Sequence, residues 1–130
     1  KRFETWANEA PAFLATYIEP QSENDLKQYD KAFKAWQKSN SKKHSDQDVI
    51  NILGAYLGQT LIKDLDMEWI IVNDEYGQDY ALQHKSSELI SFPFSSVMKR
   101  IEDEEYDFLF GIYHLLKHQA ESRELESKAK

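Results

Sequence analysis

Residues 54–69 read GAYLGQTLIKDLDMEW and contain two glycines, Gly54 and Gly58, inside a stretch whose other residues favour a helix. A glycine in a helix costs about 0.5–1 kcal/mol relative to alanine. The two lie one turn apart, so they face the same side of the helix and leave a shallow groove for another backbone. Phosphate-binding glycines follow a different order and lie in a loop after a strand. We therefore predict that both glycines pack closely against the sheet that follows.

The helix that carries this groove is apolar over more than half of its circumference. Ser45 and Asp48 predict an N-terminal cap. The apolar residues that follow are Val49, Ile50, Ile52, Leu53, Tyr56, Leu57 and Leu61. A helix so broadly apolar belongs in the middle of the structure.

Three short strands are predicted after this helix. Residues 68–73 are rich in β-branched and aromatic side chains, residues 80–84 alternate, and residues 89–92 form a third run. Gly77 lies in the first turn, where it can adopt a positive φ. We predict an antiparallel meander in which Trp69 faces the core and Pro93 ends the last strand.

Helices are predicted on both sides of this centre. Residues 3–18 look helical, with Pro11 either ending a first helix or opening a second. Residues 26–38 form an amphipathic helix, and two more helices follow, one after Ser95 or Ser96 and one from near Glu104. We expect one α+β domain over residues 1–118, with N-terminal helices, a central helix, the meander and C-terminal helices packed on one face. Residues 119–130 are expected to be a polar tail, either a frayed helix or disordered.

Composition excludes several classes of protein. The chain has 130 residues, enough for one core, and no cysteine, so disulfides, thiolate metal sites and cysteine nucleophiles are ruled out. No apolar run is long enough to span a membrane, and Glu4 and Glu9 interrupt the place where a signal peptide would be apolar. We expect a cytoplasmic protein without a membrane partner. Whether residues were removed before Lys1 stays open.

The net charge of -7 is unevenly distributed. Residues 27–43 contain six lysines and one acid, and Lys31, Lys34 and Lys38 lie on one face of the predicted helix. This face is a candidate contact for phosphate or an acidic protein surface, or it is simply solvated. Because the aromatic residues lie on the opposite face, the stacking platform that nucleic acid needs is missing. The pattern disfavours a nucleic-acid partner.

Residues 54–116 carry an ordered set of short motifs. They are Gly54, Gly58, Glu68-Trp69, Asp74-Glu75-Tyr76-Gly77, Pro93-Phe94 and Lys99-Arg100-Ile101-Glu102. Their order and spacing resemble a mainly bacterial family catalogued as a domain of unknown function, the 3806 family. The resemblance implies a compact α+β core and implies no reaction.

Two histidine arrangements are candidates for chemistry. His84 shares a strand face with Tyr80, and Glu68 lies near one end of the sheet, so a small hydrolase or small-ligand site is one interpretation. The other is a strand-end histidine bonded to a nearby loop. His114 and His118 have the spacing of paired metal ligands, but Lys117 stands where a catalytic glutamate would be and no third ligand is evident. We predict no metal and no cofactor.

The hairpin turn is the favoured contact element. Tyr76 stands among charged neighbours, including Asp74 and Glu75, and an exposed aromatic side chain is typical of an interface. We therefore expect a non-enzymatic protein-interaction module, of immunity or adaptor type by analogy of size and charge. Its protein partner is unknown, and the chain is expected to be a monomer or a weak homodimer. The alternative is the small hydrolase or ligand-binding domain that uses His84, Glu68 and Tyr80.

Overall fold

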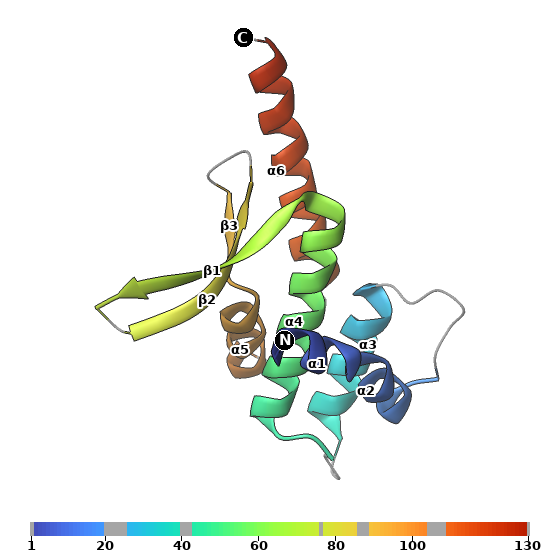
Figure 1. The fold of residues 1–130 in the computed structure, drawn as a ribbon. Coiled ribbons are helices and arrows are strands. Elements are labelled where there is room, and N and C mark those ends of the chain that lie inside the picture. Colours follow the sequence, from blue (N-terminus) through green and yellow to red (C-terminus); the bar gives the residue numbers. More distant parts are fainter. Residues whose placement is uncertain are drawn as a thin grey trace.

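A long central helix organises the fold, with the sheet on one side and other helices on the other (Figure 1). The computed structural model describes residues 2–19, 26–39, 43–75, 77–85, 89–103 and 109–129. The elements are α1 (Arg2–Asn8), α2 (Ala10–Tyr17), α3 (Leu26–Lys38), α4 (Asp46–Leu65), β1 (Met67–Asp74), β2 (Gly77–His84), β3 (Ile90–Ser91), α5 (Pro93–Asp103) and α6 (Leu109–Ala129). The predicted α+β class is confirmed. None of the helices in the described part of the chain combines the length and apolar character of a membrane-spanning segment.

The central helix, α4, begins and ends where local sequence signals place it. Ser45 accepts the backbone N–H of Asp48, and the Asp48 side chain accepts the backbone N–H of Ser45, which closes a capping box. Asp66 ends the helix with φ of 55°, a left-handed conformation that aspartate tolerates better than most residues. The chain then turns directly into β1.

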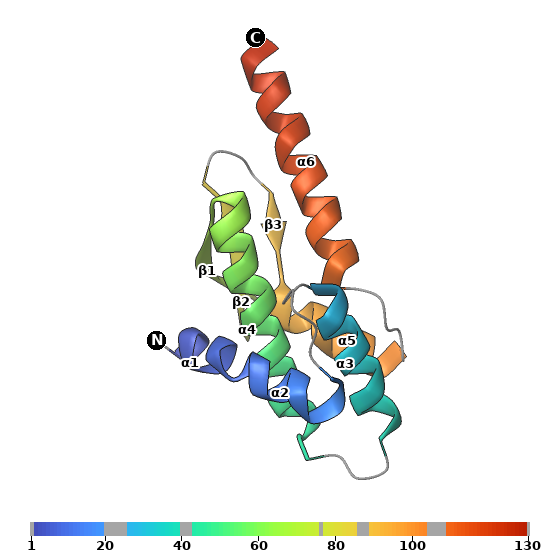
Figure 2. The same cartoon turned by 90° about the vertical axis from the view of Figure 1, so that its right-hand side faces the viewer.

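The core is built around this helix. α4 contacts α1, α2, α5, α6 and both long strands. Figure 1 shows the sheet on one side of α4 and α3 on the other, and Figure 2 shows α6 running alongside the upper part of the molecule. The largest fully buried side chains include Trp36, Tyr29, Phe13, Phe33, Leu53, Leu57 and Leu61. The two C-terminal helices divide their contacts, since α5 packs on α4 and β2 while α6 packs on α3 and α4.

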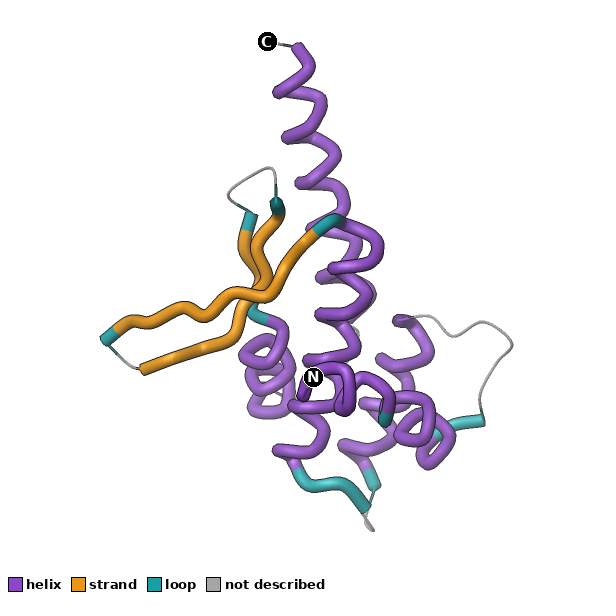
Figure 3. The backbone as a smooth tube through the Cα atoms, in the orientation of Figure 1, coloured by secondary structure: helices purple, strands orange, loops and turns teal. Residues whose placement is uncertain are grey.

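The sheet is antiparallel with the order β1-β2-β3. Its register pairs Met67 with His84, Trp69 with Leu82 and Ile71 with Tyr80, so these six side chains share one face. Most of that face is covered by helices, but the far half of the β1–β2 hairpin projects away from them (Figure 3). The third strand, Ile90–Ser91, is shorter than the predicted residues 89–92.

The groove on α4 receives two different elements. A Cβ added to Gly58 would lie 2.5 Å from the Trp69 ring of β1, as the predicted contact with the sheet requires. A Cβ added to Gly54 would instead lie 2.4 Å from the Phe94 ring and 3.1 Å from the Phe94 Cα, on α5. The prediction that both glycines pack against the sheet is therefore confirmed for Gly58 and wrong for Gly54. Pro93 is the first residue of α5, where its missing N–H costs nothing.

Several predicted features lie at the limits of the described chain. Pro11 is in the first turn of α2, which agrees with the second of its two predicted positions. The predicted start of the last helix near Glu104 lies outside the described residues. α6 continues to Ala129, beyond residue 118.

Candidate interaction surface

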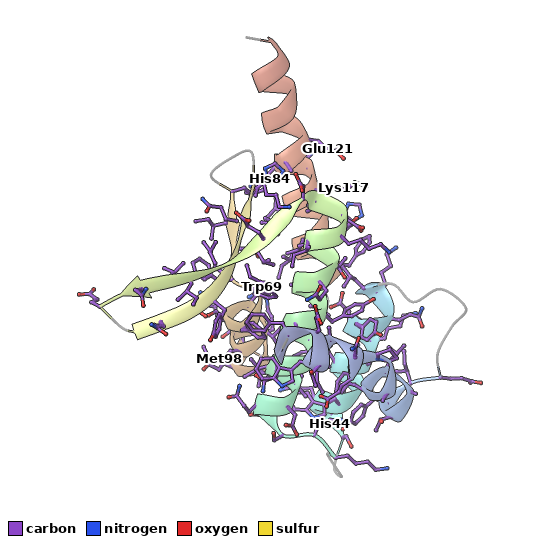
Figure 4. All side chains as sticks on the ribbon, in the orientation of Figure 1. His44, Trp69, His84, Met98, Lys117 and Glu121 are labelled. Carbon is purple, nitrogen blue, oxygen red and sulfur yellow. The ribbon has the colours of Figure 1, made fainter. Side chains whose placement is uncertain are left out.

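An aromatic cluster joins α1, the hairpin and α5. The Phe3 ring lies 4.2 Å from the Trp69 ring, 5.0 Å from the Tyr80 ring and 5.5 Å from the Phe94 ring, measured between centroids. Trp69 and Phe94 also stack at 5.7 Å. Trp69 can occupy this position because Gly58 has no side chain beneath it. The cluster therefore fixes the base of the hairpin against the helices (Figure 4).

Apolar side chains continue from this cluster to the protein surface. Ile71 is 55% exposed, and its cross-strand partner Tyr80 is 39% exposed. Met98 is 43% exposed and lies one turn after Phe94 on α5, so both project from the same side of that helix. Figure 4 shows Met98 on the side of α5 below the hairpin. We call the surface formed by Phe3, Ile71, Tyr80, Phe94 and Met98 the hairpin patch.

The hairpin around this patch is acidic. Residues 66–85 contain the acids Asp66, Glu68, Asp74, Glu75 and Asp79 and one base, Lys85. Lys85 Nζ lies 3.4 Å from Asp66 Oδ1, and Ser95 of α5 donates to Asp79 Oδ2 over 2.7 Å. Glu68 and Glu75 are exposed and enter no ion pair with a described residue. Glu68 and Asp79 lie opposite Gln83 and Val72, so they belong to the sheet face opposite Ile71 and Tyr80, and the hairpin combines an apolar face with an acidic one.

β1 is an edge strand of the sheet. The Lys85 N–H donates to the Asp66 carbonyl over 3.2 Å. Because backbone groups alternate along an antiparallel strand, this bond shows which residues of β1 direct their N–H and C=O groups toward β2. In this alternation, the N–H and C=O groups of Trp69, Ile71 and Asn73 point away from β2. No described strand pairs with β1 on that side. The outer edge of β1 therefore carries backbone groups that do not take part in its pairing with β2.

The structure does not bring the three catalytic candidates together. His84 is 4% exposed and lies opposite Met67, while Glu68 lies opposite Gln83 on the other face of the sheet. Tyr80 shares the face of His84 but lies about 13 Å away along the strand. The His84 backbone N–H donates to the Leu89 carbonyl over 2.9 Å, which ties the strand end to the following segment. His84, Glu68 and Tyr80 are therefore not placed to act as an acid/base pair with one another.

The histidines of α6 lie on its exposed side. The ring of His114 contacts Phe110 at 4.3 Å between centroids, and His118 is exposed. Among the described residues, no group of three or more histidine or carboxylate side chains is arranged to hold a metal ion. The pair therefore supplies at most two ligands in that part of the chain.

The remaining predicted contact residues are placed as follows. Lys31, Lys34 and Lys38 are exposed on α3, on the far side of α4 from the hairpin patch. Glu75 is exposed at the hairpin turn. Gly77 ends that turn with φ of 121°. Tyr76 and the Asp74 side chain lie outside the described part of the structure.

Sequence reasoning missed three members of the hairpin patch: Phe3, Ile71 and Met98. In the sequence, Ile71 is an ordinary strand residue. Its exposure depends on how far the hairpin extends beyond α5, and the residues next to it do not show this. A signal was present in β1 itself, where four apolar residues in succession, residues 69–72, must point to both faces of the sheet. Such a strand is typical of a sheet covered on both faces.

The fold and its surface define a class of protein: a small α+β domain built on one central helix, with an apolar patch on a projecting hairpin. Among known families, residues 30–113 match the one described as a domain of unknown function (DUF3806). The match covers more than half of the chain, and the protein belongs to this family. It confirms the predicted family and begins before the predicted residues 54–116, at Asp30, so the shared region includes most of α3. No curated protein and no solved structure matched the chain.

Proposed function

We propose that this protein is a non-enzymatic interaction module that binds a protein partner through the hairpin patch. The position of the exposed apolar side chains carries the proposal. Of the six large apolar side chains that are exposed in the described part of the chain, three belong to the hairpin patch: Ile71, Tyr80 and Met98. Clustered apolar exposure of this kind marks interaction sites.

The proposed partner is an extended peptide segment that carries apolar and basic side chains. Ile71, Tyr80 and Met98 offer apolar surface, and the acids of the hairpin attract lysine or arginine. The outward backbone groups of Ile71 and Asn73 can pair with an added strand, whose alternate side chains then reach the patch. Backbone pairing supplies affinity, and the patch supplies preference for apolar residues.

The rigid base of the hairpin supports this role. Phe3, Trp69 and Phe94 hold β1 against α1 and α5, so the patch is largely formed before a partner arrives. A preformed surface loses less conformational entropy on binding than a flexible one. The buried position of His84, with Glu68 on the opposite face of the sheet, gives no comparable support to a hydrolase.

Peptides selected from a random phage-displayed library against the intact chain test the proposal. Their affinities are measured by fluorescence anisotropy for the wild type, Ile71→Ser, Asn73→Pro and the control Leu115→Ser. Leu115 is 58% exposed on α6, away from the patch. Asn73→Pro removes an N–H that points away from β2, so the pairing of β1 with β2 is kept.

We expect the selected peptides to combine apolar and basic residues. Ile71→Ser and Asn73→Pro should each weaken their binding roughly tenfold or more, whereas Leu115→Ser should bind as the wild type does. Added salt should weaken peptide binding to all four proteins, because the acidic hairpin contributes through charge. Equal losses of peptide affinity in Ile71→Ser and Leu115→Ser would contradict the proposal that the hairpin patch is the binding surface.

A further inference from the structure

A second surface feature lies on the other side of α4, where that helix meets α3 and α6. A cavity of about 290 Å³ is lined by Leu26, Tyr56, Thr60, Lys63, Asp64, Phe110 and Tyr113. It shares no lining residue with the hairpin patch, because all of its lining residues belong to α3, α4 and α6. Its volume is near the lower end of small-molecule sites, about 300 Å³. A ligand with one ring fits this size.

Aromatic side chains form much of the cavity wall, and the protein holds them in place. Tyr56 packs against the ring of Tyr29 at 4.2 Å between centroids. The backbone N–H of Phe110 donates to Asp30 over 3.1 Å, and Lys27 Nζ lies 4.5 Å from the centre of the Phe110 ring. These contacts fix two rings without any ligand. The wall is therefore suited to a flat apolar group.

Both signs of charge stand beside these rings. Lys63 and Asp64 line the cavity and are exposed, and neither forms an ion pair with another described residue. The Tyr113 hydroxyl donates to Asp64 Oδ2 over 2.8 Å, which holds the carboxylate beside the aromatic wall. Thr60 donates its hydroxyl to the Tyr56 carbonyl over 3.0 Å. The polar groups left for a ligand are thus an ammonium and a carboxylate.

We infer that this cavity binds a small aromatic zwitterion, an aromatic amino acid, with its ring against Tyr56 and Phe110. Its ammonium group lies toward Asp64 and its carboxylate lies toward Lys63. An aromatic anion would be repelled by Asp64, and an aromatic cation by Lys63. Only a ligand that carries both charges satisfies both side chains.

L-phenylalanine and its singly charged derivatives test the inference. N-acetyl-L-phenylalanine is the anion, and L-phenylalanine amide is the cation. Binding to the intact chain is measured by NMR titration for the wild type, Lys63→Gln and Asp64→Asn. The matched controls are Lys43→Gln and Asp46→Asn, two exposed residues outside the cavity lining. L-leucine replaces the ring with an aliphatic side chain.

We expect L-phenylalanine to bind most tightly and to shift the resonances of Tyr56, Thr60 and Tyr113. Each cavity variant should weaken it roughly three- to fivefold. Lys63→Gln should weaken the acetylated anion but not the amide, and Asp64→Asn should do the reverse. Lys63→Gln should bind the amide, and Asp64→Asn the acetylated anion, at least as tightly as the wild type does, because a repelling charge has been removed. That retained binding shows that the cavity of each variant is intact, and Ile71→Ser should bind L-phenylalanine as the wild type does.

Three results would overturn the inference. The first is no binding of L-phenylalanine up to its solubility limit. The second is binding of L-leucine as tight as that of L-phenylalanine, which would show that the aromatic ring is not recognised. The third is an equal effect of the cavity variants and their controls. Because the peptide assay reports on the hairpin patch, either proposal can fail while the other stands.

Discussion

The carboxylate of Asp30 on α3 lies 2.8 Å from the backbone nitrogen of Leu109, the first residue of α6, and accepts its hydrogen bond. It also accepts the N–H of Phe110 over 3.1 Å, and Asp30 is only 3% exposed. The first N–H groups of a helix have no partner within it, and a negative charge there is favourable. A residue of α3 therefore caps α6 and positions the aromatic wall of the cavity.

Replacing Asp30 should destabilise the protein strongly. Asp30→Ala leaves two N–H groups at a buried helix start without their charged acceptor, and the free energy of unfolding should fall by about 2–3 kcal/mol. Asp30→Asn keeps one acceptor oxygen and should lose less. Urea denaturation measures both. Lys31→Ala, an exposed neighbour on the same helix, should change stability by less than about 0.5 kcal/mol. Similar losses for Asp30→Ala and Lys31→Ala would contradict the capping role.

Alanine at two helical glycines should change stability in opposite directions. In Gly58→Ala the new Cβ meets the Trp69 ring at 2.5 Å, so the ring must move, at a cost of about 1–3 kcal/mol. Gly111 on α6 has nothing within 4 Å of an added Cβ, so Gly111→Ala should stabilise the helix by about 0.5–1 kcal/mol. Thermal denaturation of the two variants and the wild type measures these changes in stability. Stabilisation by Gly58→Ala would show that the ring contact is not tight.

The hairpin turn should depend on Gly77 for its backbone and not for space. Its φ of 121° is rarely adopted by residues with a side chain, although no atom lies within 4 Å of an added Cβ. Gly77→Ala should therefore cost about 1–3 kcal/mol. The strain is local, so hydrogen exchange should speed up in β1 and β2 more than in α4. Unchanged exchange in the hairpin would mean that the turn relaxes without cost.

Tyr113 should ionise at higher pH than an ordinary tyrosine. Burial, and then its hydrogen bond to Asp64, raise the pKa of Tyr113 above 10.0, with further contributions from the charges of Asp64 and Glu121. The folded protein thus favours the neutral phenol. This contribution to stability is complete below pH 10.0 and is lost as the pH rises through the folded-state pKa.

Absorbance of tyrosinate during a pH titration measures this shift. Asp64→Asn removes the nearby negative charge and should lower the pKa of Tyr113, and Tyr113→Phe identifies which step of the titration belongs to this residue. An unchanged titration in Asp64→Asn would show that Asp64 has no influence on the phenol.

Local features of the fold could be predicted from the sequence. The capping box at Ser45 and Asp48, the turn at Gly77 and the apolar stripe of α3 each depend on residues only a few positions apart. Their physical causes are hydrogen bonds to near neighbours, backbone freedom and helical periodicity. The family was predicted for the same reason, because its motifs are short and ordered along the chain.

Contacts between distant residues were decided by the tertiary structure alone. Asp30 caps a helix that begins at Leu109, and Phe94 of α5 fills the position beside Gly54. Nothing in the local sequence of Ile71 shows that its part of the hairpin extends past the helices. A chain sets the local conformation of each segment through its neighbours, but which segments then meet depends on how all of them share one core. The hairpin patch and the charged aromatic cavity exist only at that level.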